Sequence, residues 1–513
     1  MTPFRASMHW LHTWVGIALG TLLFAIFWTG SLSVFYKEID RWMMPMTRLE
    51  LPASVSLDAM RPAADALAHG TNSPHWKVYL PTANEPVHNV IFQSKTDSAT
   101  LFPDAPGNIM ARRFLDPNTG DLLEDPGTLG GDFLYSFHFK LSMRRFPVGY
   151  YPVALAGMAM LALIVSGILL HGRIIANFFL FRRQKRARAS LDLHNAVGIL
   201  GLPFHFLITL TGLIFFYNLH YPLALSIPYG EDAGGYNREA IAAYARPEAG
   251  IPAEPASLDE MAAEAARIWG RPVGTVRVYH PGDKNAYALM MPRDDGAVSD
   301  VRDSLFFDVP SGKLLHNQVA KPALATERFI AGLHLIHFRH WPVRWLYFLL
   351  GLSGCVLIAT GFLFWLESRR KRHAALGLQG VRFVEGLTVG STTGVIIATL
   401  GYLVANRLLP STMPVRAAAE IGCFYFGWLA AFAHAWLRPG SAWYEQARTI
   451  AVLAVAAVVL NAATTGDHLL RTIARGDWAV AGVDMMLLVG AGIAAVSARA
   501  LSHRQIAKVR QVA

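Results

Sequence analysis

Two apolar segments of this chain begin with the same histidine-led pattern, and this repeat limits the possible folds more than any other feature. The first pattern starts at His12 and reaches Thr29-Gly30, and the second starts at His194 and reaches Thr211-Gly212. In both copies the histidine and the threonine are 17 positions apart, and the residues between them are apolar. Such self-similarity predicts that one structural unit is used twice.

The composition is typical of a membrane protein. Of the 513 residues, 53% are hydrophobic and only 16% are charged, which is too few charges for an ordinary soluble chain of this size. Several apolar runs reach the ~20 residues that span a bilayer as a helix. We therefore expect an α-helical integral membrane protein with about eight spans, placed at 11–36, 149–172, 194–219, 344–366, 381–405, 417–437, 449–466 and 478–499.

The net charge of +10 is concentrated in two basic blocks, 182–188 and 369–372, each of which directly follows an apolar run. Basic loops next to membrane helices stay in the cytoplasm, so we interpret both blocks as cytoplasmic anchors and not as nucleic-acid contacts. Both termini then lie in the cytoplasm, and the long segments between the spans lie outside. The predicted organisation is 1–36 span, 37–148 outer domain, 149–172 span, 173–193 basic loop, 194–219 span, 220–343 outer domain, 344–366 span, 367–380 basic loop and 381–513 four-span extension.

The two outer segments repeat as well. Ser56-Leu57-Asp58 and Ser257-Leu258-Asp259 each open a predicted helix, because serine or aspartate accepts hydrogen bonds from the first turn. Val/Tyr-rich pieces at 77–81 and 277–281 alternate like strands, and turn residues at 116–120 and 308–312 separate further strands. Each outer segment is therefore predicted to be a small α+β domain with one helix and a short antiparallel sheet.

Residues 1–373 thus contain two copies of helix, outer domain and helix, and both copies enter from the same side. This arrangement predicts a parallel repeat about a pseudo-twofold axis along the membrane normal. An axis of this kind brings equivalent residues together. His12 is expected to face His194 near the cytoplasmic surface, and His138 is expected to face His334 near the outer surface.

Histidines at two membrane depths suggest two haems, since haem iron accepts histidine ligands. His205 lies inside an apolar run, where an ionisable residue is costly and therefore indicates function. His194 and His205 are eleven residues apart, which on one helix gives the same face at two depths. The membrane depths of these residues also allow His171 to pair with His194 and His205 to pair with an outer histidine. The pairing of the ligands therefore stays open. The candidate ligands are His12, His138, His171, His194, His205 and His334.

Other metal sites are less well supported, because the spans contain almost no Asp or Glu and no cysteine set for zinc. Several arginines could pair with haem propionates or simply anchor the interface, namely Arg144, Arg145, Arg173, Arg339 and Arg344. The two cysteines, Cys355 and Cys423, lie in apolar runs, so no disulfide framework is expected.

The ordered set of Leu11-His12-Thr13-Trp14-Val15-Gly16, Phe137-His138, Leu191-Asp192-Leu193-His194-Asn195 and Leu333-His334, with the two outer domains, resembles the PepSY-associated transmembrane family. That family includes inner-membrane di-haem ferric-siderophore reductases. The resemblance implies an oxidoreductase of the bacterial inner membrane with two b-type haems and two periplasmic PepSY-like domains. It also implies that electrons pass to a periplasmic ferric siderophore, so that iron is released as Fe²⁺ for uptake.

The electron donor would be a quinol or a cytoplasmic reductase, because no Gly-x-Gly-x-x-Gly fingerprint follows a strand in this chain. Two other functions compete with the reductase. A transporter of iron chelates or other solutes would need no haem but would need a polar pathway. A regulatory protein that grips a partner through its outer domains would leave the membrane histidines unexplained. The sequence indicates no chemistry for residues 374–513.

Overall fold

The protein was described from a computed structural model. The structure describes residues 2–94, 101–105, 108–143, 148–170, 186–220, 223–230, 244–293, 303–319, 321–336 and 340–512, with the single positions 232, 235, 239 and 298.

Six helical segments in this part of the chain are long and apolar enough to cross a membrane. They are α1 (Pro3–Ser33), α5 (Tyr150–Leu170), α14 (Trp341–Ala375), the continuous segment Gly380–Leu408, α18 (Ala442–Thr465) and Trp478–His503 within α20 (Trp478–Val512). Gly380–Leu408 combines α15 (Gly380–Val389), the π-helix η2 (Gly390–Gly394) and α16 (Val395–Leu408). A bent pair of helices gives a seventh candidate.

One expected span, 417–437, forms a helix that is less apolar than the others. It is α17 (Arg416–Leu437), which carries Glu420 and His434 together with Tyr425, Trp428 and Trp436. These side chains keep α17 out of the set of spans, so the prediction of about eight exceeds the six or seven that qualify by length and composition.

The third predicted span, 194–219, is not one straight helix. It begins within α7 (Arg186–Leu200) and continues as α8 (Leu202–Phe215), and the two helices are bent by 64° at Gly201. Pro203 has no N–H to donate to the carbonyl of Ile199, so the helix cannot continue unbroken. The prediction that His194 and His205 share one face of one helix is therefore wrong.

The outer segments form a single eight-stranded antiparallel sheet with the strand order β3-β4-β2-β1-β5-β6-β7-β8. The strands are β1 (His75–Tyr79), β2 (His88–Gln93), β3 (Leu101–Ala105), β4 (Asn108–Leu115), β5 (Val273–Tyr279), β6 (Tyr287–Pro292), β7 (Ser304–Asp308) and β8 (Leu314–Gln318). Central strands β1 and β5 pair with Lys77 opposite Arg277. The two predicted α+β units thus share one sheet instead of forming two separate ones.

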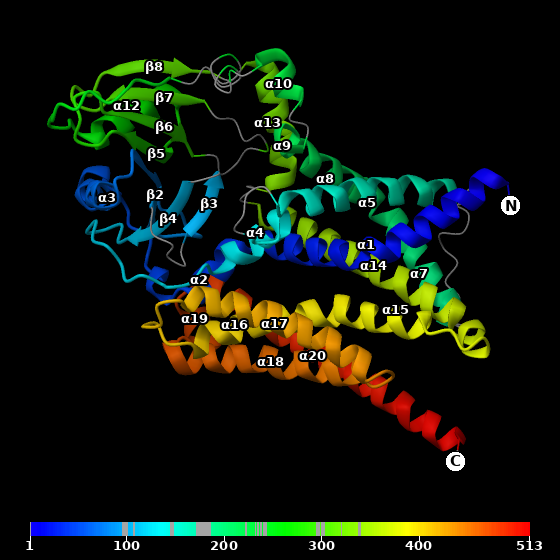
Figure 1. Ribbon diagram of the computed structural model, residues 1–513. Coiled ribbons are helices and arrows are strands. Elements are labelled where there is room, and N and C mark those ends of the chain that lie inside the picture. Colours follow the sequence, from blue (N-terminus) through cyan, green and yellow to red (C-terminus); the bar gives the residue numbers. More distant parts are fainter. Residues whose placement is uncertain are drawn as a thin grey trace.

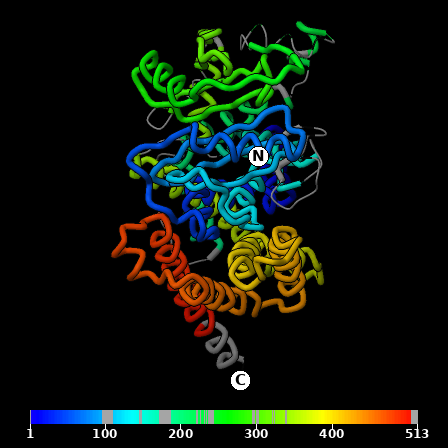
Figure 2. Tube along the Cα trace, turned by 90° about the vertical axis from the view of Figure 1, so that its left-hand side faces the viewer, coloured from blue at the N-terminus to red at the C-terminus, as the bar shows by residue number. Residues whose placement is uncertain are grey.

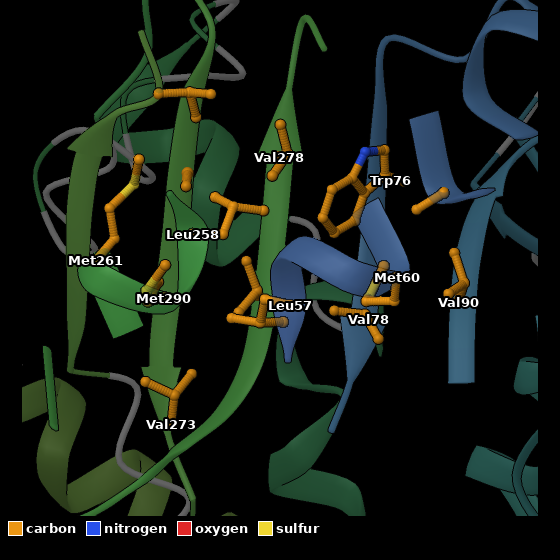
Figure 3. Close-up of a cluster of buried hydrophobic side chains, with 14 of the residues drawn as sticks. Leu57, Met60, Trp76, Val78, Val90, Leu258, Met261, Val273, Val278 and Met290 are labelled. Atoms are coloured by element: carbon orange, nitrogen blue, oxygen red, sulfur yellow. The ribbon is translucent and has the colours of Figure 1, made fainter. Parts of the chain in front are cut away.

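One face of this sheet carries the hydrophobic core, which is covered by α3 (Leu57–Thr71) and α12 (Leu258–Trp269) (Figure 3). Alternate strand residues such as Trp76, Val78 and Val278 are almost fully buried there, as the period of two requires.

The helix starts at Ser56 and Ser257 are confirmed as N-caps. The aspartate of each motif also caps the other helix. Asp259 Oδ1 accepts from the amide of Leu57 at 2.6 Å, and Asp58 Oδ1 accepts from the amide of Leu258 at 2.9 Å.

The sheet lies at one end of the long helices, and both ends of the chain lie at the opposite end (Figure 1). The connecting helices beside the sheet are α2 (Tyr36–Met43), α4 (Gly131–Lys140), α9 (Tyr217–His220), α10 (Leu223–Tyr229) and α13 (Pro322–Leu335). The last helices, from α15 through α19 (Leu469–Ala474) to α20, form a layer of their own, seen at the bottom of Figure 2. This layer packs on α1, α2 and α14.

Candidate cofactor site

Two histidines from different halves of the repeat meet far from the sheet. His12 of α1 and His194 of α7 have ring centres 6.2 Å apart, with ring planes at 90°. His12 Nδ1 lies 3.0 Å from the hydroxyl of Ser166 on α5, and His194 Nδ1 lies 2.9 Å from the carbonyl of Leu357 on α14. Because these bonds engage Nδ1, the nitrogen that could bind a metal is Nε2. We call this the sheet-distal pair.

A second pair lies at the sheet end of the helices. His138 of α4 and His334 of α13 have ring centres 6.0 Å apart, with ring planes at 21°. Here too Nδ1 is held by a helix carbonyl, that of Ile26 at 2.9 Å for His138 and that of Ile208 at 2.8 Å for His334. We call this the sheet-proximal pair. The repeat predicted the proximity in both pairs.

Each of the four rings rests on a glycine that follows a serine or threonine. A Cβ added at Gly30 or Gly212 would lie 2.7 Å from the nearest atom of the His138 or His334 ring. At Gly167 or Gly361 it would lie 3.3 Å from the His12 or His194 ring. Only glycine leaves this space, so these residues form notches for the imidazoles. The glycines occupy matching positions of the sequence repeat, but their link to the histidines was not predicted.

The sheet-distal pair lines a cavity of about 720 Å³ between α1, α5, α7 and α14. This volume lies in the range of ~300–1,000 Å³ that is typical of ligand pockets. The cavity around the sheet-proximal pair has about 170 Å³, which is below that range. Leu23 and Met160 line both cavities and therefore stand between them.

His205 has a different environment from the paired histidines. It lines the larger cavity, its Nε2 lies 3.1 Å from the hydroxyl of Ser353, and its ring packs edge-on against Phe27. Among the described residues, no other histidine ring contacts it. The pairing of His205 with an outer histidine therefore stays a prediction. His171, the sixth predicted ligand, lies outside the described residues, so its pairing with His194 stays a prediction.

The arginines also differ from expectation. Buried Arg344 binds both carboxylate oxygens of Glu38 at 2.8 Å and the carbonyl of Val34 at 2.7 Å, so it is a structural anchor. The other four candidates, Arg144, Arg145, Arg173 and Arg339, lie outside the described residues. Arg5 and Arg369 line the larger cavity and were not predicted. Their signal in the sequence was their position at the basic ends of α1 and α14.

These sites consist of pairs and not of larger clusters. In the described part of the chain, no group of three or more His, Cys, Asp or Glu could hold a metal ion. The ring centres lie 6.2 Å apart in one pair and 6.0 Å apart in the other, which is close enough for two imidazoles to bind one metal through nitrogens at about 2 Å each. The sheet-distal pair and its cavity fit a haem, whose iron His12 and His194 would hold through Nε2. The sheet-proximal pair fits by its ligands, but its cavity is too small in this conformation.

Comparison with known proteins places the chain in a family. The model of the PepSY-associated TM region matches residues 9–368. The chain is also 27% identical over 375 residues to an uncharacterized protein of Pseudomonas aeruginosa, a match that covers 70% of this chain and 91% of the relative. Together with the apolar helices, the family match indicates a multi-pass membrane protein. Because the family model spans well over half of the sequence, the chain belongs to the PepSY-associated TM family.

Proposed function

We propose that the protein is a haem-containing reductase that passes electrons across the bacterial inner membrane to a periplasmic ferric siderophore. The observation that carries this proposal is the sheet-distal pair. The ring centres of His12 and His194 lie 6.2 Å apart beside a cavity of about 720 Å³, and each Nδ1 is already hydrogen bonded. A purely structural role for these histidines would not require two such pairs at two levels of the helices.

The chain would hold two b-type haems, one at each pair. Bound haem supplies reversible one-electron chemistry, while the protein sets position, potential and access. The hydrogen bonds to Nδ1 fix the orientation of each imidazole and raise its basicity as a ligand. Arg5 and Arg369 line the sheet-distal cavity and offer positive charge to carboxylates. Apolar neighbours such as Leu23 and Met160 exclude water between the two cavities.

The parallel repeat and the membrane orientation belong to the same proposal. Basic residues follow α5 and end α14 on the side away from the sheet, which supports a cytoplasmic location for that side. The sheet then lies in the periplasm next to His138 and His334. A ferric chelate bound beside the sheet would receive electrons from that end, and a quinol or a cytoplasmic reductase would supply them at the other.

A spectrum tests the proposal directly. We expect the detergent-purified protein, produced with ample haem, to show b-type bands in a dithionite-reduced minus oxidised spectrum. A pyridine haemochrome assay should give about two haems per chain. Replacement of His12 or His194 by alanine should remove one haem and leave the other.

A second assay tests the substrate. Proteoliposomes with an internal reductant should convert an external ferric siderophore to Fe²⁺, trapped by a ferrous chelator. Wild-type protein without haem would refute the reductase and favour a solute transporter or a partner-binding protein. Bound haem without reduction of any siderophore would limit the proposal to electron transfer with another acceptor.

A further inference from the structure

The C-terminal extension, residues 381–513, holds α4 at both ends. At the N-terminal end, Tyr402 donates its hydroxyl hydrogen to the carbonyl of Gly130 at 2.9 Å. At the C-terminal end, Tyr425 donates to the carbonyl of Leu141 at 2.7 Å. Gly130 and Leu141 are the caps of α4, so the extension donates a hydrogen bond to a carbonyl at each end of this helix.

The segment that leads into α4 is fixed by the same helices. Arg416 of α17 donates to the carbonyl of Pro126 at 2.7 Å, and Thr128 donates to the carboxylate of Glu420. Glu420 and Thr128 are fully buried. Buried hydrogen bonds to charged groups are costly to break, so this segment is held rigidly.

Aromatic rings join the middle of α4 to the extension. Phe133 lies 4.7 Å from the ring of Tyr402 and 5.1 Å from that of Phe424, and Phe137 lies 5.2 Å from Phe424. The spacing of four residues places both phenylalanines on one face of α4. His138 is the next residue, and it presses into the Gly30 notch of α1. The helix is therefore packed between α1 and the extension.

In the described part of the chain, the extension does not hold the equivalent helix in the second half of the repeat. Phe329 of α13 matches Phe133 in the repeat, yet it is 48% exposed, whereas Phe133 is completely buried. Among the described residues, no hydrogen bond or ring contact joins α13 to the extension. The principal neighbour of α13 is α8, which supplies the Gly212 notch for His334.

We infer that the C-terminal extension is a positioning element for His138, and that α13 with His334 is the movable side of the sheet-proximal pair. Tyr402, Tyr425 and Phe424 act through α4 and are positioning residues. The cavity at this pair, about 170 Å³, must widen to admit a large planar group. Because α1 and the extension hold α4 on two sides, the cavity would widen through movement of α13. The assignment of His138 as a haem ligand rests on the proposed function, but the restraint on α4 does not.

Hydrogen–deuterium exchange of the full-length protein tests this inference without reference to haem. In the double variant Tyr402→Phe/Tyr425→Phe, peptides that cover 131–141 should exchange roughly tenfold faster, because two buried hydrogen bonds are lost. Peptides that cover 322–335 should not change. Tyr444→Phe is the matched control, since this tyrosine of α18 accepts from Arg448 at 3.3 Å and has no bond to α4. Phe424→Leu gives a second variant that keeps the site apolar.

A second readout separates positioning from general stability. With haem bound, the double variant should shift the low-spin electron paramagnetic resonance signal of one haem and leave that of the other unchanged. Equal exchange in α4 for the double variant and the wild type, or an equal rise in α4 and α13, would overturn the inference. Wild-type protein without haem would refute the proposed function, and the exchange experiment would still decide whether the extension restrains α4.

Discussion

The substitution Gly30→Ala tests whether a helix notch sets the position of a candidate ligand. A Cβ at this position would lie 2.7 Å from both Cε1 and Nδ1 of His138. Ordinary van der Waals contact begins at 3.4 Å, so the ring must retreat by roughly 0.7 Å. The ring cannot do so and keep its hydrogen bond of 2.9 Å to the carbonyl of Ile26, because this carbonyl belongs to the same turn of α1 as the notch.

The effect on stability is expected to be modest. Loss of the hydrogen bond costs about 1 kcal/mol and overpacking costs about 1–3 kcal/mol. Alanine recovers roughly 0.5–1 kcal/mol relative to glycine within a helix. The variant should therefore fold, with unfolding free energy lower by about 1–3 kcal/mol. The effect on the site should be larger, since loss of a bond that orients a metal-binding histidine typically costs about 10–100-fold in affinity.

The assay is haem content per chain with the reduced-minus-oxidised spectrum. Gly30→Ala and Gly212→Ala should each reduce the content from about two haems towards one. Gly167→Ala and Gly361→Ala, where the added Cβ would lie 3.3 Å from the ring, should have smaller effects. Gly482→Ala is the control, because nothing lies within 4 Å of its Cβ position. Two haems and an unchanged spectrum in Gly30→Ala would refute the notch argument, as would an equal loss in Gly482→Ala.

Three further predictions concern stability, each measured by thermal unfolding of the full-length protein. Desolvation lowers the pKa of buried His88 from 6.5 to about 4, so the histidine of the unfolded state takes up a proton first as the pH falls. Between pH 7 and pH 5 the unfolding free energy of the wild type should fall by about 2 kcal/mol, and that of His88→Leu should fall much less. Equal losses in the two proteins would contradict this account. Asp259→Ala removes the second cap of α3 and leaves Ser56 in place, so it should lower the unfolding free energy by about 1 kcal/mol. Asp58→Ala should have the same effect at α12. Arg48, the residue after η1 (Pro45–Thr47), forms a buried ion pair of 2.8 Å with Asp467 of the extension. Arg48→Met breaks this pair and should lower the unfolding free energy by about 3 kcal/mol or more. A smaller decrease would mean that this contact does not attach the extension.

Much of the candidate site could be predicted because a repeat carries spatial information. The repeat of helix, outer domain and helix about a pseudo-twofold axis was enough to place His12 beside His194 and His138 beside His334. The break at Gly201 also had a signal, since Pro203 cannot continue a helix, but the long apolar run concealed it.

Other features depend on contacts between distant segments, which periodicity does not report. Nothing within β1 or β5 specifies that the two strands pair with each other. The buried polar groups of the extension, such as Glu420, Asn461 and Asp484, also looked isolated in sequence. Asp484 accepts from the indole of Trp42, 442 positions away, at 2.7 Å.

The glycine notches show which half of the repeat positions each histidine. Each histidine rests on a glycine of its own half: His12 on Gly167, His138 on Gly30, His194 on Gly361 and His334 on Gly212. The histidine pairs, in contrast, always join one half to the other.

One half can therefore orient two histidines, but it cannot complete a pair. The distance within each pair depends on how the halves dock, and outside the helices they dock through the β1–β5 pairing and the reciprocal caps of Asp58 and Asp259. Substitutions at these caps should consequently disturb both pairs together, whereas a change at one notch should disturb only one.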